Sequence, residues 1–122
     1  MAEEEIPKQV QDQINRLQQM RVQQQMIMQQ RQQVELRLKE IEEALEELNK
    51  TDSKTPIYKN VGSLLIKTKG KSEVVKELKA NKDSLELRKN TLEKQDNRTR
   101  EKLNELQNKV QSSLNVNQGT SS

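Results

Sequence analysis

Apolar residues recur every three to four positions along a long polar stretch in the first half of the chain. If Val10 is position a of a heptad, nine of the twelve a and d positions from Val10 to Leu48 are apolar. The exceptions are Gln13, Gln24 and Arg31. Apolar a and d positions at this spacing predict a coiled-coil helix, which we expect over residues 8–49.

A second stretch, residues 72–110, repeats the pattern more weakly, with seven of the twelve a and d positions from Val75 to Ser113 apolar. The two series fit each other in antiparallel order, because a register that places Leu45 opposite Leu78 also places every a position opposite a d position. The same register places Gln24 opposite Thr99, a polar pair that would fix the alignment. We expect flexible tails at residues 1–7 and 111–122, which are acidic or rich in Ser and Asn.

Between the two helical stretches, a linker and hairpin are expected over residues 50–71, where Pro56 to Thr68 is the only β-like segment. Asn60, Val61 and Gly62 would form the turn, and Leu64 and Ile66 would share one apolar face. A two-stranded hairpin is marginal alone and leaves two open edges, so it would complete its sheet with hairpins of other chains. The alternative is a reversing loop that packs back on its own helices.

The composition excludes most enzyme chemistry. The chain of 122 residues has no Cys, no His and one aromatic residue, and 34% of its residues are charged. Thiol and imidazole catalysis and the commonest zinc sites are therefore excluded, and the three glycines form no phosphate-binding loop. We expect a protein that is not an enzyme and that has no cofactor and no metal.

The same composition bears on location and partners. No window approaches the ~20 apolar residues of a membrane span, and the N-terminus lacks an apolar leader segment, which together predict a soluble, cytoplasmic protein. The net charge of +3 comes mostly from lysines around the hairpin. Such lysines usually prevent unwanted strand pairing, and without a basic helix or aromatic platforms they give nucleic-acid binding little support.

The ends of the two helices that lie far from the hairpin carry apolar residues that a two-helix seam shields only in part. Fraying there would expose more of this surface to unfolded proteins, which several such tips would hold together more strongly than one. The alternative is ordinary seam packing without a ligand. The predicted client-binding residues, called the tip set below, are Ile6, Val10, Ile14, Leu17, Met20, Leu103, Leu106, Val110 and Leu114.

Three segments carry a resemblance to a known family. They are ALEEL at 44–48, IYKNVGSLLIK at 57–67 and LELRKNTLEKQ at 85–95. With two antiparallel helices joined by a single hairpin, the chain resembles the β class of the prefoldin family, in particular its archaeal form. The resemblance spans residues 8–110, and the hairpin segment is its most specific part.

The resemblance implies a mainly α fold, a long antiparallel two-helix coiled coil whose β-hairpin assembles into an intersubunit β-barrel. It implies a hexamer of two α-class and four β-class subunits that captures unfolded or nascent proteins at its tips without ATP and delivers them to a group II chaperonin. The runner-up is a coiled-coil scaffold or adaptor that holds no clients. The oligomerisation residues carried over, called the hairpin set below, are Ile57, Tyr58, Val61, Gly62, Leu64, Leu65 and Ile66.

Overall fold

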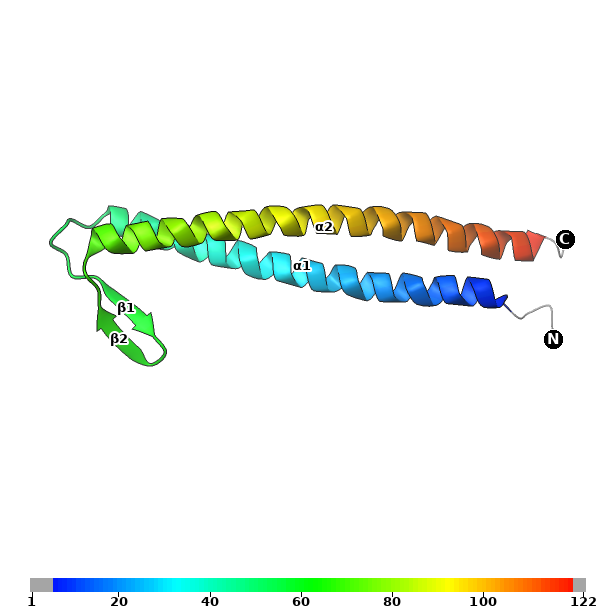
Figure 1. The fold of residues 1–122 in the computed structure, drawn as a ribbon, viewed down its shortest axis with the longest axis horizontal. Helices are drawn as coiled ribbons and strands as arrows, with labels where there is room; N and C mark the ends of the chain where they lie inside the picture. The colour runs from blue at the N-terminus through cyan, green and yellow to red at the C-terminus, as the bar shows by residue number, and fades with distance from the viewer. Residues whose placement is uncertain (1–5, 120–122) are drawn as a thin grey trace. The chain divides into compact units, whose positions relative to one another are not determined.

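Two long helices flank one short antiparallel hairpin in the computed structural model, which describes residues 6–119 (Figure 1). Helix α1 spans Lys8–Asn49, strands β1 and β2 span Tyr58–Val61 and Leu64–Lys67, and helix α2 spans Lys71–Gly119. The predicted mainly α fold with a β-hairpin between two helices is confirmed.

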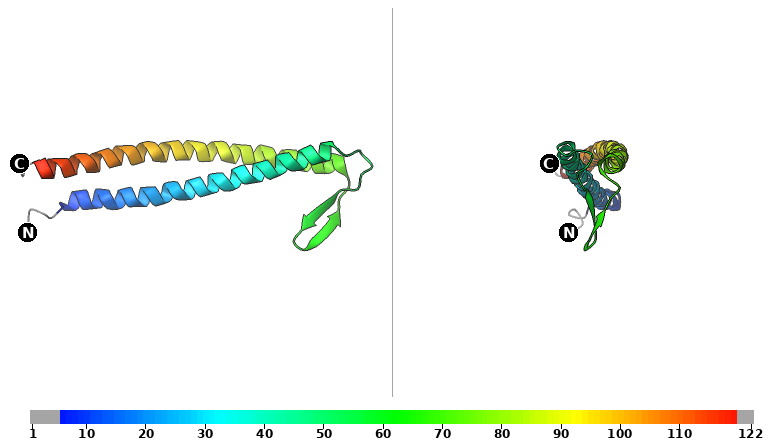
Figure 2. Two further views of the ribbon diagram at one scale, coloured as in Figure 1. Left: turned by 180° about the vertical axis from the view of Figure 1, so that it is seen from behind. Right: turned by 90° about the vertical axis from the view of Figure 1, so that its left-hand side faces the viewer.

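The chain divides into two compact units. The first, called the hairpin unit, is Arg31–Thr91; it contains the second part of α1, both strands and the first part of α2. The second, called the terminal unit, pairs α1 up to Gln30 with α2 from Leu92 onwards. Within each unit the two helices lie side by side and run in opposite directions (Figures 1 and 2).

The seam of each unit follows the heptad pattern, since every predicted a and d position of both helices is buried or half-buried. The predicted coiled-coil seam is therefore confirmed. The buried apolar residues of the hairpin unit are Val34, Leu38, Ile41 and Leu48. Those of the terminal unit are Val10, Leu17, Leu92, Leu106 and Val110.

Helix α2 continues past the predicted end at residue 110 to Gly119. The segment after Val110 contains no Pro and no Gly before Gly119, so nothing in it stops a helix, and Ser113 and Leu114 stay half-buried in line with the seam. The expectation of a tail from residue 111 was therefore wrong over 111–119. Of the other predicted tail residues, Ile6 and Pro7 precede α1, whereas residues 1–5 and 120–122 lie outside the described residues.

The hairpin has a two-residue turn at Gly62 and Ser63, with Tyr58 paired to Lys67 and Val61 paired to Leu64. Gly62 has a φ of 60°, which only a glycine adopts without strain at the first position of this kind of turn. The predicted turn began two residues too early and left out Ser63, because Asn60 and Val61 belong to β1.

The linker between α1 and β1 is held by local hydrogen bonds. Asp52 accepts them on Oδ1 from the backbone N–H groups of Lys54, at 2.8 Å, and Thr55, at 2.9 Å. These bonds, with that of Lys54 the strongest influence, lower the pKa of the Asp52 carboxyl below its ordinary value. At the far side of the hairpin, Thr68 donates from N and Oγ1 to the Ile57 carbonyl, which closes the base of the two strands.

Candidate functional site

The hairpin leaves its apolar side chains uncovered. Residues paired across the strands share a face, so Val61, Leu64 and Ile66 lie on one face, while Tyr58 and Leu65 lie on the other. All eight strand residues are exposed, and Leu65 and Leu64 reach 72% and 63%. In the described part of the chain the sheet has only these two strands, so each strand keeps one unpaired edge. Both features are typical of a sheet that pairs with other chains.

The hairpin projects from the helix pair of its unit (Figure 2), and an ion pair links it to α2. Lys59 Nζ lies 2.8 Å from Glu77 Oε1. A groove of about 570 Å³ remains between hairpin and helices, with Ile57, which is half-buried, among its lining residues. Because the strand residues stay exposed, a loop that packs back on its own helices does not describe this segment.

The tip set lies mostly inside the seam of the terminal unit. Val10, Leu17, Leu106 and Val110 are buried, each at 9% exposure or less. Four others are half-buried, namely Ile14, Met20, Leu103 and Leu114. Ile6 is the most exposed, at 38%. Seam packing thus accounts for the four buried residues, and the open apolar surface of this set is limited to Ile6 and the half-buried side chains.

A buried polar cluster in the terminal unit was not singled out from the sequence. Asp96 is 1% exposed, and its Oδ1 accepts hydrogen bonds from Gln24 Nε2 at 3.4 Å and from Arg100 Nε at 3.3 Å. Gln24 therefore contacts α2 one turn away from Thr99, its predicted partner. The sequence does indicate such a cluster, because Asp96 stands at heptad position a. An unpaired charge buried in a seam costs free energy, so a carboxylate at that position predicts polar partners close to it.

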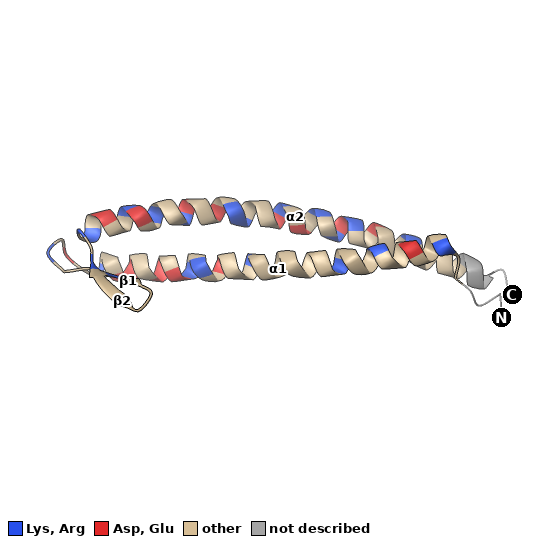
Figure 3. Ribbon diagram, turned by 60° about the horizontal axis from the view of Figure 1, so that its bottom comes forward, with Lys and Arg blue, Asp and Glu red and all other residues tan. Residues whose placement is uncertain are grey.

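The outer surface of α1 in the terminal unit is also unusual. Charged residues of both signs alternate along α2, whereas α1 has a long uncharged stretch (Figure 3). In that stretch, VQQQMIMQQ at 22–30, Val22 is 59% exposed and Met26 55%. Val22 and Met26 stand at heptad positions f and c, which normally face water. Apolar residues at these positions could have predicted an exposed apolar surface, but this surface was not singled out from the sequence.

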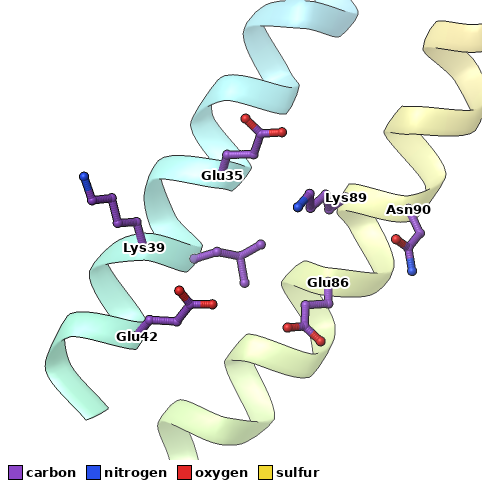
Figure 4. Close-up of a pocket in the computed structure, with 7 residues that line it drawn as sticks. Glu35, Lys39, Glu42, Glu86, Lys89 and Asn90 are labelled. Atoms are coloured by element: carbon purple, nitrogen blue, oxygen red, sulfur yellow. The ribbon is translucent and has the colours of Figure 1, made fainter. Parts of the chain in front are cut away.

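A groove between the helices of the hairpin unit is lined by charges of both signs (Figure 4). It has a volume of about 330 Å³, and the buried Leu38 forms part of its wall. Its labelled residues are Glu35, Lys39, Glu42, Glu86, Lys89 and Asn90. Opposite charges compensate one another there, which is typical of a solvated flank of a coiled coil.

Nowhere in residues 6–119 do three or more His, Cys, Asp or Glu side chains gather as a metal site would require. Among the described helices, neither combines the length and the apolar character of a membrane span.

A long antiparallel helix pair joined by an open, apolar hairpin defines the class of fold. Comparison with known proteins narrows this class. A family model described as "Prefoldin subunit" matches residues 11–116, and the chain belongs to the prefoldin family, a family of chaperone subunits.

The similar proteins agree on the subunit class. The chain is 45% identical to the prefoldin subunit beta of Archaeoglobus fulgidus, over 94% of this chain and 98% of that one. It is 43% identical to the prefoldin subunit beta of Thermococcus onnurineus, over 93% and 97%. The crystal structure of the prefoldin beta subunit from Thermococcus strain KS-1 superposes with a TM-score of 0.80 at 41% identity, over 90% of this chain and 96% of that one.

Proposed function

We propose that this chain is the β-class subunit of an ATP-independent holdase that captures unfolded or nascent proteins in the cytoplasm and delivers them to a group II chaperonin. The observation that carries the proposal is the family match over nearly the whole chain, together with a hairpin whose apolar residues have no cover within the described chain.

The hairpin set would form the platform of the assembly. Each hairpin offers two unpaired edges and an aliphatic face formed by Val61, Leu64 and Ile66. Pairing those edges with hairpins of neighbouring subunits would satisfy the backbone groups and bury the aliphatic face, as in an intersubunit β-barrel. The partners we propose are two α-class subunits for every four copies of this chain.

The tip set would hold the client. Because four of its residues are buried in the seam, capture requires either the half-buried side chains or local opening of the helix ends. The last turns of a helix open at little cost, and Met20 adapts to irregular apolar surfaces. Weak contacts at several tips would add up to firm binding.

The test is suppression of light scattering when a denatured reporter protein is diluted into buffer without nucleotide. The intact assembly with an α-class subunit should suppress aggregation, and removal of residues 1–14 and 108–122 should abolish suppression. Because trimming also removes seam contacts, a second variant changes only accessible residues: Ile6→Ser, Ile14→Ser and Leu114→Ser. This variant should lose most of the suppression while forming a complex of unchanged mass.

Two outcomes would contradict the proposal. Full suppression by the trimmed assembly would remove the trimmed part of the tip set, namely Ile6, Val10, Ile14, Val110 and Leu114, as the client site. A complex of full mass that never suppresses aggregation would indicate a scaffold or adaptor without holdase activity. Delivery is tested by adding a group II chaperonin with ATP, which should convert held reporter into active reporter.

A further inference from the structure

The terminal unit carries a groove on the flank of its seam, and no residue of the tip set lines it. Its volume is about 380 Å³. On α1 it is lined by Gln23, Met26 and Ile27 among others, and on α2 by Gln95, Arg98 and Lys102 among others. All of these residues belong to the same unit.

The two walls of this groove differ in chemistry. The α1 wall comes from the uncharged stretch 22–30, where Met26 is 55% exposed and Ile27 half-buried. On the α2 wall, Arg98 and Lys102 are the only charged residues that line the groove. Within the described residues, neither forms an ion pair with a carboxylate.

The groove of the hairpin unit provides the contrast. That groove combines three glutamates with two lysines, and Leu38, which lines it, is buried. The groove of the terminal unit instead offers an exposed thioether and two cations without a compensating carboxylate. Its charge and its apolar wall are therefore both complementary to a ligand that carries carboxylates next to an aliphatic side chain.

We propose that this groove is a second client-contact site, which holds extended segments of unfolded polypeptide whose aliphatic side chains are flanked by Asp or Glu. The aliphatic side chain would pack on Met26 and Ile27, and the carboxylates would lie against Arg98 and Lys102. A thioether wall accepts side chains of varied shape, as a client site requires. This inference rests on the proposed holdase function but concerns different residues from the tip set.

The probe is a set of fluorescein-labelled peptides of twelve residues with a central Leu-Leu pair flanked by Glu, by Ser or by Lys. Binding to the assembly of this chain with an α-class subunit is measured by fluorescence anisotropy. We expect the Glu-flanked peptide to bind about threefold or more tightly than the Ser-flanked one at low salt, because an exposed charge contact has this order of strength. The difference should disappear at high salt, which screens such contacts.

Three variants locate the site. Met26→Gln should weaken both peptides about threefold or more. The double variant Arg98→Gln and Lys102→Gln should remove the advantage of the Glu-flanked peptide and leave the Ser-flanked one unchanged. Val22→Gln is the matched control, since Val22 lies on the same helix with similar exposure but does not line the groove, and it should change neither peptide.

The inference is overturned if the Glu-flanked and Ser-flanked peptides bind equally, or if Val22→Gln weakens binding as much as Met26→Gln. Measurements on the assembly trimmed at its tips distinguish a failure of the groove proposal from a failure of the proposed tip function. Peptide binding that survives trimming supports the groove even if client suppression is unaffected by trimming. Suppression that trimming abolishes, without selective peptide binding, leaves the tip proposal standing and removes the groove.

Discussion

The hairpin unit and the terminal unit bury their apolar residues in different ways. In the hairpin unit the buried apolar residues all come from α1, whereas α1 and α2 both contribute in the terminal unit. The reason lies in α2, whose a positions in the hairpin unit include Lys82 and Lys89. Lys82 reaches across to Glu42 of α1, with Nζ 3.8 Å from Oε1, and does not fill the seam with an apolar group.

The two units differ in how completely each one covers its own apolar surface. The terminal unit closes its seam from both helices and fixes it with the Gln24–Asp96 hydrogen bond. The hairpin unit keeps half-buried leucines on α2 and a hairpin whose strand residues are all exposed. A unit of this kind gains most from association, because apolar surface that is uncovered in one chain can be buried between chains.

The largest expected effect comes from breaking the hairpin's aliphatic face with Leu64→Asp and Ile66→Asp. Burial of each side chain between subunits is worth roughly 1.5–3 kcal/mol, so affinity for the partner subunits should fall by about 100-fold or more. Size-exclusion chromatography with light scattering should show loss of the assembled mass, while circular dichroism keeps its helical signal.

The control for this change is Leu87→Asp in the same unit. Leu87 is 70% exposed but lies on α2 and not on the sheet, so assembly should be unaffected. An assembled mass that survives the hairpin double variant would show that the exposed sheet is not where the hairpin unit associates.

A smaller effect is expected from the seam of the terminal unit when Asp96 is replaced by Leu. Exchange of a buried polar contact for a well-packed apolar one is often neutral or stabilising by about 1–4 kcal/mol, and Arg100 can turn to water because its side chain is 54% exposed. Thermal unfolding followed by circular dichroism should therefore show an equal or higher midpoint for this variant.

Asp96→Leu should make the alignment of α1 against α2 less uniform. A polar contact in a seam fixes the register, so spin labels at Met20 and Leu103 should report a broader distance distribution in the variant. Asp96→Asn, which keeps an acceptor for Gln24, should retain the narrow distribution. A destabilised Leu variant with an unchanged distribution would contradict the role of Asp96 as a register contact.

These two regions also show how far the sequence predicts the structure. The seam follows directly from heptad spacing, because a and d positions of a helix face its partner whatever the details of packing. The hairpin also followed from local residue types, although the extent of its turn did not, since Asn60 is typical of turns but belongs to β1. The end of α2 was misjudged because Ser and Asn are weak helix formers that tertiary contacts override, as half-buried Leu114 illustrates.

The candidate surfaces were less predictable. The exposure of the tip set depends on how closely the two helices pack. Heptad positions do not specify that packing. The Asp96 contact needs the actual offset between the helices, since Gln24 lies within reach of both Asp96 and Thr99 in an antiparallel seam. The groove beside Met26 combines residues about 70 positions apart and becomes visible only once both walls are placed.

The turn of the hairpin unit gives a third, more local test. Gly62 has a φ of 60°, and a Cβ there would meet nothing within 4 Å, so any cost of substitution is conformational and not steric crowding. Gly62→Val should destabilise the hairpin by about 1–2 kcal/mol, whereas Gly62→Asn should cost less, because Asn enters positive-φ conformations more readily than a β-branched residue. Partner affinity should fall in the same order, as measured by titration with the α-class subunit. Equal losses for Val and Asn would contradict this explanation.

The smallest effect is expected in the linker of the same unit, where Asp52 is fully exposed. Hydrogen bonds from Lys54 and Thr55 lower the pKa of this carboxyl in the folded chain, so the ionised form favours the folded linker. That contribution is complete above the unfolded pKa, near 3.8, and is lost as the pH falls through the lower folded value. Hydrogen exchange at the Lys54 and Thr55 amides should thus be faster in Asp52→Asn than in the original chain at pH 7, and the difference should vanish in strong acid. Thr51→Ser, whose hydroxyl can still donate to the Leu48 carbonyl, should leave both amides unchanged. A difference that persists in strong acid would mean that the charge of Asp52 does not hold the linker.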